Sequence, residues 1–318
     1  MLKERLNRAL ISVLEQFQYD GRAPLVRDDL EPTLIMSCTE PGFGDFSSSV
    51  PLRLAGSNAS QALSIAQGLA LRMQASKEAE ELIEELLVVA PGYLNFHLRT
   101  ACLTQVLCEI HREKQFYGQS RLARASLSLE NSQQKYNSPS LSLDNDQLAA
   151  TIGFDPEMVG PTSRRKPLEF MRYVYARCSS LLNLAHQEYP NVHEGRIDPP
   201  PFENTEWQKL QNLFATEYSI FEPAFVRQGK TLALPRTLTL RLDALSFELD
   251  HLENGKDSLR LFRYAYEVAT CLEEFRQTVR IQTDDRALLA GALGVLAAGC
   301  QVLSNLFKPI GVILPEAI

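Results

Sequence analysis

Residues 284–307 read DDRALLAGALGVLAAGCQVLSNLF, and Lys308 and Pro309 follow them. Asp284 and Asp285 suit the first turn of a helix, because carboxylates are stabilised near the positive end of the helix macrodipole. Beyond them, apolar side chains occupy nearly every face of the helix rather than one stripe, which is typical of a helix surrounded by protein. Lys308 suits the last turn, and Pro309 cannot continue the helix. We therefore expect this segment to form the core of a helical bundle.

The composition is that of an ordinary globular chain. Its 318 residues are 45% hydrophobic and 22% charged, enough for two domains that each bury a core. The formal net charge of −7 argues against a general polyanion binder, which carries a basic balance. Binding of one shaped RNA through a local basic groove is compatible with this charge.

Cysteine and histidine usage gives no sign of a metal site. The six cysteines include no Cys-x-x-Cys pair, and the five histidines are scattered. Such cysteines are typical of small core residues in a reducing compartment. The start, MLKER, does not resemble a signal peptide, and the longest strongly apolar run, about residues 287–300, is shorter than the roughly 20 residues of a membrane span. We expect a cytoplasmic protein without metal or cofactor and without a membrane partner.

The first part of the chain mixes helical and strand patterns. Apolar residues at helical spacing predict a helix over residues 2–18, and a short apolar run predicts a strand over residues 33–38. A second helix passes through residues 61–73, and an acidic one covers residues 76–85. A turn and a strand follow within residues 90–98.

This last strand separates two kinds of side chain. Leu94, Phe96 and Leu98 alternate along it and form a core face. The other face carries an aromatic, an amide and an imidazole, namely Tyr93, Asn95 and His97. These groups can stack on and hydrogen-bond to an unpaired base. The alternative is a sheet face that simply meets water.

The middle of the chain has the composition of a flexible linker. Residues 119–166 are rich in Ser, Asn and Gln, and they end on the basic cluster Arg164, Arg165 and Lys166. This cluster either binds phosphate or is the solvated end of the linker.

The last part of the chain is predicted to be helical. In the helix that begins at residue 167, Met171, Val174 and Cys178 form a core stripe, whereas Phe170, Tyr173 and Arg177 follow a different face. Arg177 binds RNA phosphate or pairs with an acidic side chain in the bundle. Residues 231–249 fit either a strand or a helix. Residues 258–280 form a strong helix that carries Arg276 and Arg280 near its end.

Two motifs in the first part resemble a known family. Gly44-Asp45-Phe46, with Val50, Leu52, Leu54 and Ala55, is similar to the G-D-Y-x-x-N-x-A-L-x-L-A stretch of the N-terminal appended domain of arginyl-tRNA synthetases. Pro91-Gly92-Tyr93, Asn95-Phe96 and Leu98 are similar to its later G-P-G-F-I-N-F-x-L strand. In the family this domain meets the tRNA elbow near the D-loop, and the resemblance implies that the strand through Asn95 contacts it.

The last part resembles the anticodon-binding domain of the same family, named after its Asp-Ala-Leu-Arg (DALR) signature. Residues 286–289, 302–303, 306, 311–312 and 315–316 are similar to its final segment. Tyr173, Ala176, Arg177 and Ser180 match the family stretch P-Y-x-Q-Y-A-H-A-R-I-x-S-I. Of the family's F-N-x-F-Y-N stretch only Phe275 is present, which puts inherited anticodon specificity in doubt.

The resemblance implies an α+β N-terminal domain (residues 1–118), a linker in place of the catalytic core (residues 119–166) and an all-α helical DALR-type domain (residues 167–318). The chain shows neither the His-x-Gly-His turn nor the Lys-Met-Ser-Lys-type loop of a class I synthetase core. We expect a protein that is not an enzyme and that binds tRNA, with arginine tRNA as the candidate.

The expected RNA contacts are Tyr93, Asn95, Arg164, Arg165, Lys166, Tyr173, Arg177, Arg276 and Arg280. A protein of this kind serves as an adaptor for a tRNA-modifying enzyme or another protein partner, or as a sensor of tRNA supply. The alternative is a protein-interaction module that derives from a synthetase and has lost RNA binding.

Overall fold

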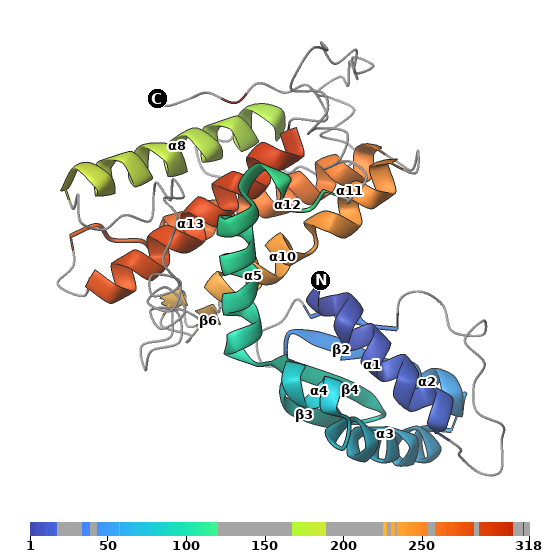
Figure 1. The fold of residues 1–318 in the computed structure, drawn as a ribbon. Coiled ribbons are helices and arrows are strands. Elements are labelled where there is room, and N and C mark those ends of the chain that lie inside the picture. Colours follow the sequence, from blue (N-terminus) through green and yellow to red (C-terminus); the bar gives the residue numbers. More distant parts are fainter. Residues whose placement is uncertain are drawn as a thin grey trace. The chain divides into compact units, whose positions relative to one another are not determined.

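A computed structural model describes most of the two regions predicted to fold. The described residues are 1–17, 34–38, 43–56, 58–119, 167–188, 225–227, 230–232, 234–253, 258–282, 286–307 and 314. The chain divides into an N-terminal unit, Met1–Leu103 with Arg227–Leu232, and a helical unit, Thr104–Val226 with Ala233–Ile318 (Figure 1). Residues 120–166, predicted to be a linker, lie outside the described residues, and so do Arg164, Arg165 and Lys166.

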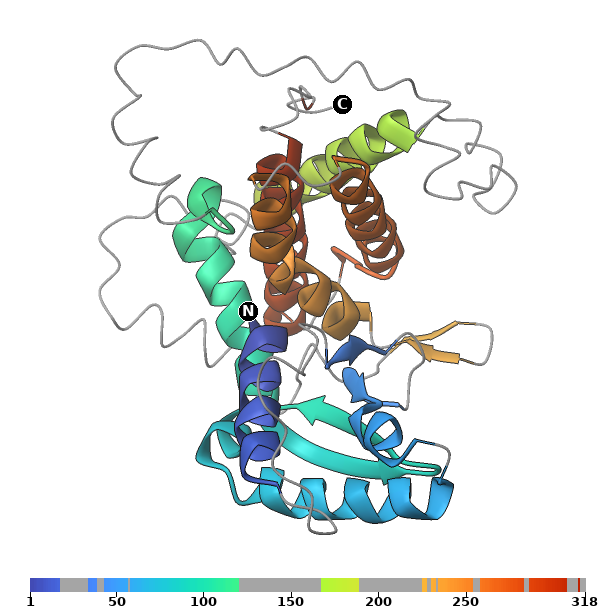
Figure 2. The ribbon, with the colours of Figure 1, turned by 90° about the vertical axis from the view of Figure 1, so that its right-hand side faces the viewer.

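The N-terminal unit is an α+β fold around an antiparallel sheet. The strand order is β1 (Met36–Ser37), β2 (Phe46–Ser48), β4 (Tyr93–Leu98) and β3 (Ile83–Val89). Its helices are α1 (Leu2–Gln16), α2 (Val50–Ala55), α3 (Ala59–Gln74) and α4 (Lys77–Leu82). Helix α3 packs against β3 and β4, and α1 packs against α3 and α4 (Figure 2). The predicted fold class of this part is confirmed.

The core of this unit follows the predicted periodicities. Leu94, Phe96 and Leu98 on β4 are fully buried, which confirms the predicted core face of that strand. Phe46, which pairs with Phe96 across the sheet, is buried as well. On α1 the apolar residues at helical spacing are buried, as expected for an amphipathic helix that covers a core.

One predicted helix is shorter than expected. The acidic helix predicted over residues 76–85 ends at Leu82, and Ile83–Val89 form β3 instead. Glutamate favours helices, but β3 pairs with β4 along its length, and Leu86 lies directly opposite Phe96. Strand pairing depends on partners distant in sequence and overrides this local preference. The strand predicted over residues 33–38 is likewise reduced to Met36–Ser37.

Gly44 and Asp45 connect β2 to β4 at a point where only glycine fits. Gly44 has a φ of +88°, and a Cβ atom there would lie 2.7 Å from the carbonyl oxygen of Phe96. The next residue, Asp45, donates its backbone N–H to the same oxygen at 2.8 Å and accepts the N–H of Leu98 on Oδ2 at 2.7 Å. The two sequence motifs of this unit are therefore hydrogen-bonded to each other through Asp45.

The helical unit is built around α13 (Arg286–Phe307), as predicted. The other helices are α8 (Pro167–Glu188), α10 (Leu234–Asp243), α11 (Leu245–Glu253) and α12 (Ser258–Arg276), all of which contact α13. From Leu289 on, nearly every side chain of α13 is buried, so the expected core helix is confirmed. The ambiguous residues 231–249 are mainly helical, in α10 and α11, after a two-stranded sheet of β5 (Phe225–Arg227) and β6 (Lys230–Leu232).

The apolar stretch of α13 is longer than the sequence analysis expected. Among the described residues, Leu289–Phe307 are long and apolar enough to cross a membrane by length and composition alone. Within the fold, 83% of this stretch is buried, which is also what the core helix of a bundle shows.

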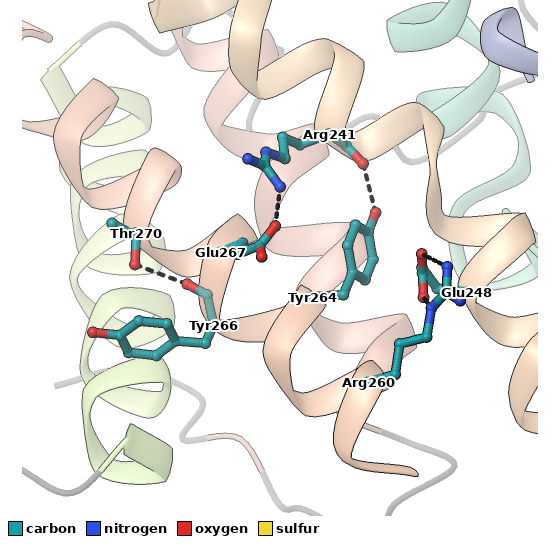
Figure 3. Close-up of polar contacts among 7 residues, drawn as sticks. All are labelled: Arg241, Glu248, Arg260, Tyr264, Tyr266, Glu267 and Thr270. Atoms are coloured by element: carbon teal, nitrogen blue, oxygen red, sulfur yellow. Dashed lines mark hydrogen bonds and ion pairs between the residues drawn. The ribbon is translucent and has the colours of Figure 1, made fainter. Parts of the chain in front are cut away.

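Polar contacts tie α10 and α11 to α12 (Figure 3). Arg241 forms an ion pair with Glu267, and the hydroxyl of Tyr264 donates to the backbone carbonyl of Arg241 at 2.6 Å. Arg260 binds the carboxylate of Glu248 through Nε at 2.7 Å and Nη2 at 3.0 Å. Because each contact joins two helices, together they hold the helices in register.

Helix α5 (Thr100–Glu113) continues into a short helix, η2 (Lys114–Phe116), that is anchored on α13. The amide of Asn305 donates to the carbonyls of Lys114, at 2.9 Å, and Tyr117, at 3.1 Å. One turn earlier, Nε2 of His111 lies 2.9 Å from the carbonyl oxygen of Gly294. The sequence prediction placed residues 104–118 in the first domain, whereas here they are grouped with the helical unit.

Candidate nucleic-acid interface

The predicted aromatic and basic face of α8 is only partly on the surface. Arg177 is exposed and Tyr173 is half-buried. Phe170 is buried, and its ring lies against that of Tyr266 on α12, with 5.4 Å between the centroids. Helical spacing groups Phe170 with the other two residues, but its ring is buried because α12 packs against α8.

Arg177 and Tyr173 contact each other along α8. The guanidinium carbon of Arg177 lies over the ring of Tyr173, 5.7 Å from its centroid. The residues are four positions apart, so the contact follows from helical spacing. The arrangement is a cation–π pair, in which the positive charge also remains open to solvent.

Arg276 is engaged by a carboxylate on its own helix. Its Nε and Nη2 atoms donate to the two oxygens of Glu273 at 2.7 Å and 2.6 Å. The same carboxylate accepts the side-chain amide of Gln277 at 3.1 Å. The side chains of Arg276 and Glu273 are only 15% and 14% exposed, so solvent screens this pair weakly.

The charges of α8 and α12 act on each other. Burial by itself would raise the pKa of Glu273, but the hydrogen bonds from Arg276 and Gln277 and the charges of Arg276 and Arg177 hold it below its ordinary value. The hydrogen bond to Glu273 raises the pKa of Arg276, to which the Tyr173 phenol also contributes. Helix α8 packs against α12, and the charges of Tyr173 and Arg177 on α8 act on the Arg276–Glu273 pair of α12.

We call this group the α8–α12 cluster, and it consists of Tyr173, Arg177, Glu273, Arg276 and Gln277. Glu273 and Gln277 were not among the sequence candidates. The signal for them is their spacing, since they lie three residues before and one residue after Arg276 on a helix. Arg280, the remaining candidate on this segment, lies exposed beyond the end of α12.

The second group of candidates lies on β4 in the N-terminal unit. Tyr93 is 37% exposed, as the prediction requires. Asn95 is only 3% exposed, and its Oδ1 accepts the hydroxyl of Ser47 on β2 at 2.8 Å. The prediction of an open amide at Asn95 is therefore wrong. Asn95 lies in the middle of the sheet with Ser47 and Leu87 directly opposite on either side, and these cross-strand neighbours flank it.

Within the described part of the chain, no group of three or more His, Cys, Asp and Glu residues could hold a metal ion. The cysteines there are free thiols.

The sequence of the N-terminal unit matches a family model. Residues 1–98 match the arginyl tRNA synthetase N terminal domain. The chain is related to the arginyl-tRNA synthetases. The matched residues include both sequence motifs of the N-terminal unit, which are in contact through Asp45 and Leu98. They also include Tyr93 and Asn95.

Curated relatives extend this likeness. An arginine–tRNA ligase of Pelodictyon phaeoclathratiforme is 27% identical over 173 residues, which are 52% of this chain and 26% of the relative. One of Desulfitobacterium hafniense is 25% identical over 171 residues, 52% of this chain and 25% of the relative. The matches thus span about a quarter of the length of these relatives. No solved structure matches the chain.

The two groups of candidate residues differ in whether the family model covers them. The β4 group lies inside residues 1–98, whereas the α8–α12 cluster lies outside them. Because the relatives match 52% of the chain, their likeness is not confined to residues 1–98.

Proposed function

We propose that this chain binds tRNA without charging it. The observation that carries the proposal is the synthetase N-terminal domain at residues 1–98, together with a surface of the helical unit where Tyr173 and Arg177 offer an aromatic ring and a guanidinium. Aromatic rings stack on bases and guanidinium groups bind phosphate, and both contacts are common in RNA recognition.

In this proposal the helical unit is a DALR-type anticodon-binding domain and arginine tRNA is the candidate ligand. The protein acts as an adaptor that presents tRNA to a modifying enzyme or another protein, or as a sensor of tRNA supply. The absence of the His-x-Gly-His and Lys-Met-Ser-Lys-type motifs from the 318 residues supports a role without aminoacylation.

Two measurements test the proposal. The first is the affinity of the full chain for total tRNA and for an arginine tRNA transcript at several salt concentrations, with a double-stranded RNA of equal length as control. We expect saturable tRNA binding that weakens as salt rises. The second is arginine-dependent exchange of pyrophosphate into ATP, which we expect to stay at the level of heat-inactivated protein. Exchange above that level contradicts a role without aminoacylation.

A protein-interaction module is the second candidate function. The arrangement of the candidate residues favours it in two places, because Asn95 is buried and Arg276 is paired with Glu273. The net charge of −7 also favours it. If the full chain binds no tRNA at low salt but captures a defined protein from its native cell, this second function replaces the first.

A further inference from the structure

The α8–α12 cluster has the composition of an anion site. Glu273 accepts hydrogen bonds from Nε and Nη2 of Arg276, at 2.7 Å and 2.6 Å, and from the amide of Gln277, at 3.1 Å. The parallel donors of a guanidinium bind a phosphate group in the same two-pronged way as a carboxylate. The carboxylate of Glu273 accepts these donors in the geometry that a bound oxyanion would use.

A second cation, Arg177, acts on the Arg276–Glu273 pair through its charge. Arg177 approaches from α8, lies over the ring of Tyr173 and contributes to the low pKa of Glu273 through its charge. The cluster therefore contains two guanidinium groups, of which Arg276 binds the carboxylate of Glu273 directly, and it has one more positive than negative charge. An anion with two or more oxygens matches this excess better than a neutral ligand does.

The carboxylate is held firmly in place. With side chains 14% and 15% exposed, Glu273 and Arg276 lose little of their attraction to solvent screening. An anion that enters the cluster has to displace the carboxylate of Glu273 or bind to Arg177 alone.

We propose that Arg177, Arg276 and Gln277 form a phosphate-binding site that the carboxylate of Glu273 occupies in the free protein. The site is self-blocked: phosphate binds weakly until Glu273 moves aside. The phosphate comes from an RNA backbone or from a free phosphate compound. Only the RNA source rests on the proposed function, so the two sources are tested separately.

The first experiment uses inorganic phosphate and the full chain. We expect Glu273→Gln to bind inorganic phosphate about tenfold or more tightly than the wild type, because an amide of the same shape no longer competes as an anion. Adding Arg177→Ala should remove this gain. The matched control is Glu188→Gln at the exposed end of α8, which removes the same charge eleven residues after Arg177 and should leave the affinity unchanged. Equal affinity of wild type and Glu273→Gln overturns the proposal, and so does an equal gain in the control.

The second experiment uses the wild type and does not depend on a variant that folds. The Nε–Hε NMR signals of Arg177 and Arg276 are followed during a phosphate titration. We expect the signal of Arg177 to shift and that of Arg276 to stay unchanged over the same range, since Glu273 holds the latter. A shift of both signals at the same phosphate concentration means that Glu273 does not block the site.

The third experiment separates the sources of phosphate. If RNA uses this site, tRNA affinity rises in Glu273→Gln and falls again in Glu273→Gln with Arg177→Ala. If inorganic phosphate binding rises in Glu273→Gln while neither protein binds tRNA, the phosphate site stands and the proposed tRNA function is wrong. If tRNA affinity is high in the wild type and insensitive to Glu273→Gln, RNA does not use this site, and a self-blocked RNA site is excluded.

Discussion

The carboxylate of Asp45 accepts a hydrogen bond from the backbone N–H of Leu98, with 2.7 Å between Oδ2 and N. These residues are 53 positions apart, and each belongs to one of the two motifs that resemble the synthetase N-terminal domain. The contact explains why the first motif carries an aspartate at position 45. It closes β2 against β4 and orders the end of the strand that carries Tyr93 and Asn95.

Asp45→Ala should destabilise the N-terminal unit by about 1.5–3 kcal/mol, because it leaves the N–H of Leu98 buried without its charged acceptor. Urea unfolding followed by circular dichroism measures the change. The control is Glu84→Ala at an exposed position of β3, which should change stability by less than about 0.5 kcal/mol. Equal effects of the two substitutions would mean that the Asp45 contact contributes nothing specific.

Gly44→Ala should destabilise the fold more than Gly56→Ala does. Both glycines have positive φ, +88° and +60°, so both substitutions strain the backbone, each by about 1–3 kcal/mol. A Cβ atom on Gly44 would in addition lie 2.7 Å from the carbonyl oxygen of Phe96, whereas one on Gly56 meets no atom within 4 Å. The close approach to β4 is therefore the reason to expect the larger loss of stability at Gly44. A larger loss for Gly56→Ala would contradict the geometry at Gly44.

The stability of the helical unit should fall in mild acid because of His111. Burial lowers the pKa of His111 to about 4 from 6.5, although its hydrogen bond with Gly294 opposes the shift. Between these values the unfolded chain binds a proton that the folded chain does not, so stability rises with pH across the window from 4 to 6.5. The full effect is about 3 kcal/mol. Unfolding curves at closely spaced pH values measure it.

In His111→Gln this component of the pH dependence should disappear, because the amide keeps a donor near Gly294 but does not titrate. If wild type and variant lose stability in parallel between pH 6.5 and 4, other groups account for the acid sensitivity.

Tyr173→Ala and Arg177→Ala should weaken tRNA binding and leave the fold intact, since Arg177 is exposed and Tyr173 is only half-buried. Loss of a stacked aromatic costs about 1–3 kcal/mol. Loss of one phosphate contact lowers the slope of log affinity against log salt by about one. The measurement is tRNA affinity at several salt concentrations.

The control for Arg177→Ala is Lys77→Ala, which removes one exposed positive charge from α4. It should leave the salt slope nearly unchanged. If both substitutions act alike, the effect is one of net charge. If neither Tyr173 nor Arg177 matters, RNA uses another surface of the chain.

Most helices and the core face of one strand were predictable because their signals are local. The apolar residues of α1, α12 and α13 recur at helical spacing or fill every face, and Leu94, Phe96 and Leu98 alternate along β4. Each pattern lies within one segment, so it predicts the same helix or strand in any fold that buries the apolar face of that segment. The resemblance to the synthetase N-terminal domain was equally readable, because it rests on consecutive residues.

The sequence by itself determined which segments are apolar on one face or on all, and its resemblance to the synthetases implied that an α+β part precedes a helical part. Only the tertiary structure decided that Ile83–Val89 extend along β4 rather than continue a helix, that Phe170 turns into the core against Tyr266, and that Asn95 is held by Ser47. The same holds for the α8–α12 cluster, in which Glu273 binds Arg276 beside Arg177. Periodicity shows which face of a helix or strand is buried. Which residues that face contacts depends on segments that are distant in the sequence.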